Sequence, residues 1–326
     1  MNLLRTCAAA LCVATAALAP SGASAQQPYP SRPIHMIIPL AVGSAVDNGA
    51  RVLTQRMSIE MGQPFVLENL PGSSGLMGAD RVAHGAPDGY TIGGFNDSVL
   101  TMIPHIYSKV PWDALTDFVP VSLVGTIEWG LVVKPDSPYK SVADFIAAAK
   151  AAPGKLNYGS GGNGSPQHIA MAMFLSRAGA TMTHVPYKGA TPAALGVAGG
   201  EVDAAFQGLG TVISLIQGGK LRLLAVSTQQ RLPQYPDVPT VNEAGLADFY
   251  FNSWFAIVAP KGTPRPIVDR LNGAMRKSLD DAGTRKQLVD LGITIRGSSP
   301  DEFGNALRSQ YELYRKVIQA NDIKSD

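Results

Sequence analysis

The sequence is poor in cysteine and in charge, and both shortages limit what the protein can be. Its two cysteines, Cys7 and Cys12, lie at the very start, and charged residues make up only 16% of the 326 residues, against about 25% in an average protein. Lysine and arginine number 27 and aspartate and glutamate 25, with no basic block. The sequence therefore lacks the clustered positive charge that binding to a nucleic acid requires. Hydrophobic residues reach 45%, which excludes a disordered chain.

The first 25 residues predict a signal peptide. Arg5 supplies a positive start, residues 7–18 form an apolar run too short to span a bilayer, and Ala23 to Ala25 offer small residues to a signal peptidase. We expect cleavage after Ala25 and a protein located in the periplasm. Both cysteines precede that point, so the mature chain would have no disulfide. Beyond residue 26 no apolar run approaches the ~18 residues of a membrane helix.

Runs typical of strands alternate with runs typical of helices along the mature chain, which predicts an α/β fold with parallel sheets. We expect strands over residues 34–39, 65–68, 90–95, 131–134, 156–158, 181–185, 204–206, 221–227 and 254–259. Helices are expected over residues 45–61, 141–151, 166–178, 266–280 and 301–320. We expect two domains with the binding site in the cleft between them: residues 26–128 plus 252–326 form domain 1, and residues 129–251 form domain 2.

Two turns from a strand into a helix have the composition of an anion site. In the first, Ser44 and Asp47 have the spacing of a capping box, and Gly43 permits a tight turn. The second is a glycine-rich loop over residues 159–165, followed by Pro166 at the first helical position. Free amides and the helix dipole favour a carboxylate or phosphate at such turns. Both turns are expected at the carboxyl ends of strands, where α/β sheets bind ligands.

Other interpretations of the second loop remain open. Gly159, Gly161 and Gly164 fit G-x-G-x-x-G, but the acidic residue expected about 20 positions later in a dinucleotide site is missing. A loop shaped only for packing is also possible. Ser160 and His168 are close in sequence, yet no G-x-S-x-G motif supports an exported serine hydrolase. No H-E-x-x-H pattern is present, and we expect neither a metal nor a cofactor.

Several further segments are shared with a known family. They are residues 29–34 (YPSRPI), 43–51 with Asp47 and Arg51, 68–72, 87–91 (PDGYT), 159–168, 185–189 (VPYKG), 239–245 and 262–264 (GTP). In these segments, which occur in order over nearly the whole mature chain, the protein resembles the periplasmic solute receptors of tripartite tricarboxylate transporters, the Bug-type receptors.

The resemblance implies a fold similar to type II periplasmic binding proteins, a two-domain α/β clamshell, and a binding function without catalysis. It implies that loop amides hold a ligand carboxylate, that a membrane permease receives the ligand, and that the receptor acts as a monomer. The same clamshell could instead report ligand to a membrane kinase. The residues expected at the site are Leu40, Ala41, Val42, Gly43, Ser44, Ala45, Ser98, Ser160, Gly161, Gly162, Asn163, Gly164, Ser165, His168, Tyr187 and Gln207.

The chain departs from the family pattern at three places. Leu40 stands where the family usually has phenylalanine, and Gly43-Ser44 stands where it has two glycines. Gln207 replaces a common acidic residue that could hold an amino group. We therefore expect a ligand without an ammonium group, either an aliphatic dicarboxylate or an aromatic acid.

Overall fold

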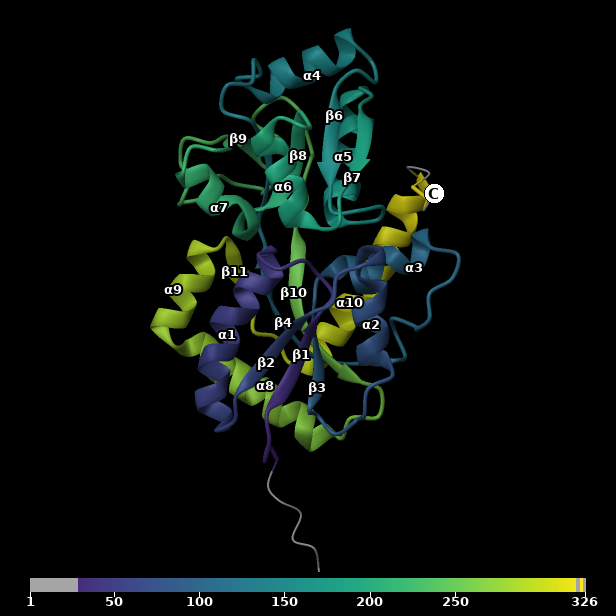
Figure 1. The fold of residues 1–326 in the computed structure, drawn as a ribbon, viewed down its shortest axis with the longest axis vertical. Coiled ribbons are helices and arrows are strands. Elements are labelled where there is room, and N and C mark those ends of the chain that lie inside the picture. Colours follow the sequence, from purple (N-terminus) through teal and green to yellow (C-terminus); the bar gives the residue numbers. More distant parts are fainter. Residues whose placement is uncertain (1–28, 321–322, 325–326) are drawn as a thin grey trace, which may run out of the picture.

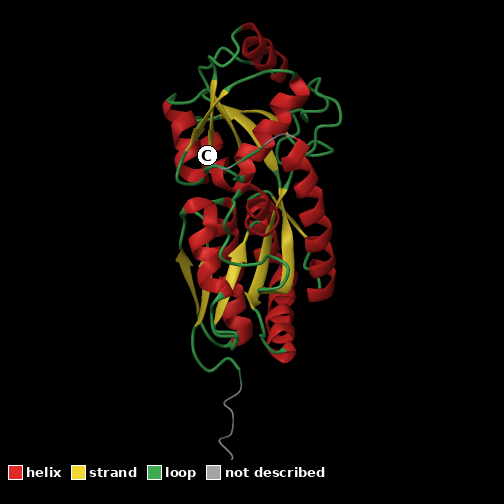
Figure 2. Cartoon of the chain, turned by 90° about the vertical axis from the view of Figure 1, so that its right-hand side faces the viewer, coloured by secondary structure: helices red, strands yellow, loops and turns green. Residues whose placement is uncertain are grey.

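The computed structural model describes residues 29–320 and 323–324, so the predicted signal peptide and its cleavage after Ala25 lie outside the described residues. The chain forms two lobes, each built on its own β-sheet with helices on its faces (Figures 1 and 2). None of the described helices combines the length and the apolar character needed to cross a bilayer.

Lobe 1, the lower one in Figure 1, is built on a six-stranded sheet in the order β11-β4-β10-β3-β1-β2. Strands β1 to β3 are parallel, whereas β10 runs antiparallel to β3 and β4, and β11 antiparallel to β4. The strands are β1 (Ile34–Ile38), β2 (Phe65–Asn69), β3 (Thr91–Phe95), β4 (Phe118–Ile127), β10 (Ser253–Pro260) and β11 (Ile293–Ile295). The helices are α1 (Ala45–Met61), α2 (Leu76–Ala83), α3 (Ile103–Ile106), α8 (Arg265–Asp280), α9 (Ala282–Asp290) and α10 (Pro300–Ala320).

Lobe 2 is built on a five-stranded sheet in the order β7-β6-β8-β5-β9. Strand β6 is parallel to β7 and β8, while β5 is antiparallel to β8 and β9, so this sheet is mixed as well. The strands are β5 (Trp129–Val133), β6 (Asn157–Ser160), β7 (Thr183–Pro186), β8 (Ala204–Gly208) and β9 (Arg222–Val226). The helices are α4 (Val142–Ala151), α5 (Pro166–Ala178), α6 (Ala190–Gly199) and α7 (Leu209–Gln217).

The chain crosses between the lobes at two neighbouring places. Only Glu128 separates β4 from β5, and residues 227–252 lead from β9 back to β10. Ser227 ties the crossings together, because its N–H donates to the Trp129 carbonyl (2.9 Å) and its Oγ donates to the Phe251 carbonyl (2.7 Å). Since each sheet takes its strands from one side of these crossings, we propose residues 26–128 with 252–326, and residues 129–251, as the two domains.

Helix α2 packs directly against the end of β1, where the first predicted loop begins. A Cβ atom on Gly78 would lie 2.7 Å from Cβ of Pro39, 2.8 Å from its Cα and 2.9 Å from the carbonyl oxygen of Leu70. Two of these neighbours are backbone atoms that cannot rotate away. Because Gly78 has no side chain, α2 can pack closely against this loop.

We predict that Gly78→Ala lowers the free energy of unfolding by about 1–3 kcal/mol, because the added methyl group overpacks the contact between α2 and β1. The matched control is Gly273→Ala in α8, where a Cβ atom would meet no other atom within 4 Å. Alanine there should be neutral or stabilising by up to about 1 kcal/mol. Urea unfolding of both variants provides the measurement, and equal stability for the two would contradict the packing argument.

Candidate functional site

The two loops singled out in the sequence line one cavity between the lobes. It has a volume of about 520 Å³, and both Ser44 and Gly162 lie in its lining. Its walls are largely apolar, with Ile127 and Trp129 at the crossing between the lobes. Lys188 is the one charged residue in the lining contributed by the described residues. An anion in this cavity would thus be surrounded mainly by backbone and neutral side chains.

The predicted site residues divide into two groups. Ten of them line the cavity: Leu40, Ala41, Ser44, Ala45, Ser98, Gly161, Gly162, Asn163, Ser165 and Tyr187. Six do not: Val42, Gly43, Ser160, Gly164, His168 and Gln207. Most of the second group hold the loops in place through hydrogen bonds, as described below. Ligand contact by any of these residues stays a prediction.

Three amides of the first loop already have partners within the protein, contrary to the expectation of free amides there. The N–H of Gly43 donates to Asp47 Oδ2 (2.8 Å), that of Ser44 to the Ala41 carbonyl (3.1 Å), and that of Ala45 to Thr211 Oγ1 in lobe 2 (2.9 Å). The expected cap is present, since Ser44 Oγ accepts the N–H of Asp47 (3.3 Å).

Other residues of the same loop line the cavity and have amides without a partner among the described residues. Leu40, Ala41 and Val46 all line it, and their N–H groups have no hydrogen-bond partner among the described residues. Val46 is the second residue of α1, where a helix leaves its N–H groups unpaired. Lobe 1 therefore offers a set of free donors at the positive end of a helix.

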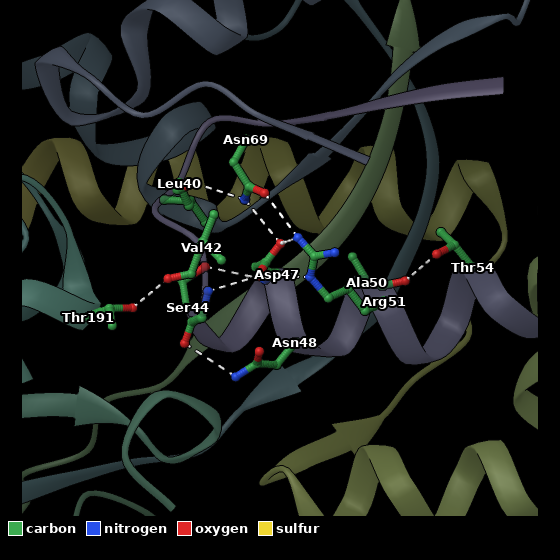
Figure 3. A network of polar contacts seen from close by, with 11 residues as sticks. Leu40, Val42, Ser44, Asp47, Asn48, Ala50, Arg51, Thr54, Asn69 and Thr191 are labelled. Carbon is green, nitrogen blue, oxygen red and sulfur yellow. Dashed lines mark hydrogen bonds and ion pairs between the residues drawn. The ribbon is translucent and has the colours of Figure 1, made fainter. Parts of the chain in front are cut away.

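The buried carboxylate of Asp47 holds the first loop in shape (Figure 3). Besides Gly43, its oxygens accept from Asn69 Nδ2 (3.0 Å) and from Arg51, whose Nη2 and Nε lie 3.0 and 3.1 Å away. Asn69 Nδ2 also donates to the Leu40 carbonyl (3.1 Å). The sequence identified Asp47 by its capping-box spacing and as a shared family position, and Arg51 as a shared family position. The structure shows that Asp47 also fixes the loop without lining the cavity.

The glycine-rich loop is held by a side chain behind it. Ser160 Oγ accepts the N–H of Gly162 (3.1 Å) and lies 2.6 Å from His184 Nε2. Ser160 is fully buried and does not line the cavity, so its hydroxyl is not placed to attack a ligand there. The described residues also contain no cluster of histidine, aspartate or glutamate suited to a metal ion.

His168 supports the other side of this loop. Its Nδ1 accepts the N–H of Gly164 (3.2 Å), and its ring stacks on His184 with centroids 4.1 Å apart. The predicted cap of α5 is present, because Ser165 Oγ accepts the N–H of His168 (3.4 Å). With these amides occupied, the N–H of Gly161 is left without a partner among the described residues, and it lies in the cavity lining.

The N-terminus of α6 supplies amides that the sequence did not reveal. Its N-cap is Gly189, with a φ of 126° and no capping side chain. Lys188, Gly189 and Ala190 line the cavity, and their N–H groups have no partner within the described part of the chain. Residues 185–189 carried the family resemblance, but without a serine, threonine, asparagine or aspartate cap they gave no local sign of a helix start.

Hydrogen bonds join the two lobes across the cavity mouth. Thr191 Oγ1 of α6 donates to the Val42 carbonyl (2.8 Å), as Figure 3 shows, and Ser74 Oγ donates to the Asn163 carbonyl (2.6 Å). The Tyr107 hydroxyl also donates to the Asn163 carbonyl (3.2 Å). These contacts place the first loop of lobe 1 against the N-terminus of α6. Sequence reasoning missed these contacts because they join residues from 56 to 149 positions apart.

Comparison with known proteins places the chain among solute receptors. The family model of the tripartite tricarboxylate transporter family receptor matches residues 49–323. Protein BugT of Bordetella pertussis (strain Tohama I) is 34% identical over 326 residues, covering 99% of each chain. The solved structure of R. palustris Rpa4515 with adipate is 32% identical, with a TM-score of 0.89 over 91% of this chain and 100% of that one. MatC from Rhodopseudomonas palustris with bound malate is 29% identical, with a TM-score of 0.85 over 89% and 100%.

A buried carboxyl group lies directly behind the cavity wall. Asp97 is fully buried between Asn96 and Ser98, which both line the cavity, and its Oδ1 accepts from Ser253 Oγ, also in the lining. Its Oδ2 has no partner among the described residues. Burial raises the pKa of Asp97 to about 7, although hydrogen bonds from Ser253 and from the Trp254 backbone act in the opposite direction.

The raised pKa of Asp97 predicts the direction in which the stability of the protein changes with pH. The folded protein holds the Asp97 proton up to about pH 7, whereas the unfolded chain releases it near its ordinary value of 3.8. The free energy of unfolding should therefore fall between about pH 4 and pH 7 and stay low above that range. Asp97→Asn is neutral at every pH and should remove this fall, which amounts to on the order of 2–4 kcal/mol.

Urea unfolding at about pH 4 and pH 8 checks this, with Asp237→Asn on the surface as the control. The free energy of unfolding of Asp97→Asn, relative to that of the wild type, should be greater at about pH 8 than at about pH 4. A variant that is less stable than the wild type at about pH 8 would show that the charged form of Asp97 is the stabilising one.

Proposed function

Because the chain belongs to the tripartite tricarboxylate transporter receptor family, we propose that it captures a small organic carboxylate between its lobes and delivers it to a membrane permease of that transporter class. Its family consists of binding proteins, and the chain is not an enzyme. Family members work in the periplasm, which fits the signal peptide expected from the sequence. We propose that the receptor acts as a monomer.

One observation carries the proposal of a carboxylate: residues with free amides from both lobes line a single cavity. Lobe 1 contributes the N–H groups of Ala41 and Val46, and lobe 2 those of Gly161, Gly189 and Ala190. Hydrogen bonds from amides to an ionised oxygen are about twice as strong as bonds between neutral groups. The N-termini of helices α1 and α6 also carry partial positive charge from the helix dipole, which favours an anion as well.

The lining also supports a ligand without an ammonium group. No aspartate or glutamate of the described residues lines the cavity, and Gln207 is neutral and fully buried behind the lining. A buried ammonium would have no counter-charge there, which is costly. The apolar walls, including Trp129 and Ile127, suit an alkyl or aromatic body. We therefore propose an aliphatic dicarboxylate or an aromatic acid as the ligand.

The bound acids in two similar structures support this class. Adipate is bound to Rpa4515 and malate to MatC, and neither acid carries an amino group. The identity of about 30% between these proteins and the present chain leaves room for different pockets. The carboxylate is the feature that the two acids share, and it is the part of the ligand that backbone amides would hold regardless of side chains.

The proposal is tested by thermal unfolding with succinate, adipate, benzoate, glutamate and aspartate, followed by calorimetry. An acid present at 100 times its dissociation constant should stabilise the folded protein by about 2.7 kcal/mol. We expect such a shift with at least one acid that lacks an amino group. Tight binding of glutamate or aspartate alone would overturn the ligand class, and no shift with any carboxylate would overturn the receptor function.

Adding a methyl group at Gly161 should weaken ligand binding without preventing the protein from folding. A Cβ atom on Gly161 would lie 3.2 Å from the amide nitrogen of Ala190, directly against a donor that the ligand is to reach. We predict that Gly161→Ala weakens carboxylate binding by about 10- to 100-fold, the effect of losing one charge-assisted hydrogen bond. The control is Gly199→Ala at the other end of α6, where the methyl group meets nothing.

Calorimetry with the best acid of the panel gives the affinities, and ligand-free unfolding confirms that both variants are folded. Unchanged affinity in Gly161→Ala would remove the Ala190 amide from the proposed carboxylate seat.

A further inference from the structure

Gln167 presents an unpartnered acceptor to the cavity. This residue of α5 is 4% exposed and lies in the cavity lining. Its Nε2 donates to Gln207 Oε1 (3.3 Å), but its Oε1 has no hydrogen-bond partner among the described residues. A bound molecule that supplies a donor could therefore form a hydrogen bond with this oxygen inside the cavity.

The orientation of the Gln167 amide is fixed by a chain of two glutamines. Gln207 is fully buried, and its Nε2 donates to the carbonyl of Ala190 (3.2 Å). Because a carbonyl only accepts, Gln207 must turn its NH₂ group to Ala190 and its oxygen to Gln167. Gln167 must then turn its own NH₂ group to Gln207, which leaves Oε1 facing the cavity.

This acceptor lies beside the proposed carboxylate seat. A Cβ atom placed on Gly161 would be 3.2 Å from Gln167 Oε1 and 3.2 Å from the Ala190 nitrogen, so the acceptor and the free amide flank the same point. A carboxylate oxygen bound to that amide cannot also face Oε1, since two acceptors repel. The ligand atom that meets Gln167 must therefore belong to a donor close to the carboxylate.

The charge of the lining restricts that donor to a neutral group. An ammonium would meet no aspartate or glutamate among the described lining residues, and the charged residue in that lining, Lys188, would repel it. A hydroxyl group donates one hydrogen bond and needs no counter-charge. On a small acid, a hydroxyl next to the carboxylate is the one carried by the adjacent carbon atom.

We propose that Gln167, oriented by Gln207, determines specificity by selecting acids with a hydroxyl group on the carbon next to the carboxylate. The proposal rests on the function proposed above, because it takes the ligand carboxylate to be seated at Gly161 and Ala190. Gln167 then contacts the ligand hydroxyl, whereas Gln207 is a positioning residue that touches only Gln167 and the Ala190 carbonyl.

The test compares pairs of acids that differ only in this hydroxyl: malate with succinate, and mandelate with phenylacetate. Calorimetry on the full mature chain should show tighter binding of the hydroxy acid, by about tenfold or more, in at least one pair. Gln167→Leu should bring the two members of that pair to equal affinity. The control is Gln217→Leu on an exposed glutamine at the end of α7, which should keep the preference.

A second variant tests the orientation itself. In Gln207→Leu nothing holds the amide of Gln167, so its NH₂ group is free to turn to the cavity. The preference for the hydroxy acid should then fall, while binding of the unsubstituted acid stays the same or improves. A structural role alone would weaken both acids equally and lower the unfolding temperature.

The possible outcomes separate the two proposals. If the wild type binds none of the four acids and no carboxylate of the panel above, the proposed function fails. If it binds only other acids of that panel, or binds succinate and phenylacetate each as tightly as the hydroxy partner, the proposed function stands and the role of Gln167 is wrong. A hydroxy-acid preference that survives in Gln167→Leu would likewise assign the hydroxyl to another residue.

Discussion

The structure depends on a selection among the backbone N–H groups of the cavity loops: some are paired within the protein, and others have no partner among the described residues. In the first loop the carboxylate of Asp47 takes the N–H of Gly43, and Thr211 takes that of Ala45. In the glycine-rich loop Ser160 and His168 do the same for Gly162 and Gly164. Each of these bonds removes a donor and fixes the loop, so the remaining donors point in set directions before any ligand arrives. Side chains that are mostly outside the cavity lining thus determine which backbone donors remain available to an anion.

Small residues let the two lobes bring these donors to one place. A Cβ atom on Gly189 would lie 2.6 Å from the Cβ of Ala41, and one on Gly208 or Gly210 would lie 3.3 or 3.2 Å from Cβ or Cα of Ala45. These contacts join the start of α1 to lobe 2 on either side of the cavity. A larger side chain at any of them would hold the lobes apart, and the donors of one lobe would then bind an anion without help from the other.

The sequence predicted the parts of this arrangement that have local causes. Helices α1 and α5 begin where Ser44 and Ser165 cap them, and a cap can be recognised from three or four adjacent residues. Helix α6 has a glycine in that place, and its start was not predicted. The pairing of Gln167 with Gln207 depends on the register of α5 against β8, 40 residues apart, which no local pattern encodes. The expectation of parallel sheets missed β5, β10 and β11 because strand direction follows from the two crossings near Glu128 and Ser227, not from residue type.

Holding an anion mainly with backbone dipoles, with the exposed Lys188 as the one charge in the described lining, would have a consequence for release. A buried arginine would keep most of its attraction for a carboxylate after the lobes separate, because both charges stay on one lobe. Here the donors are divided between Ala41 and Val46 on one side and Gly161 and Ala190 on the other. Opening therefore removes one set of hydrogen bonds completely and lets water replace them on the ligand. Strong capture in the closed form and easy release in the open form then follow from the same arrangement, as a receptor that must hand its ligand to a permease requires.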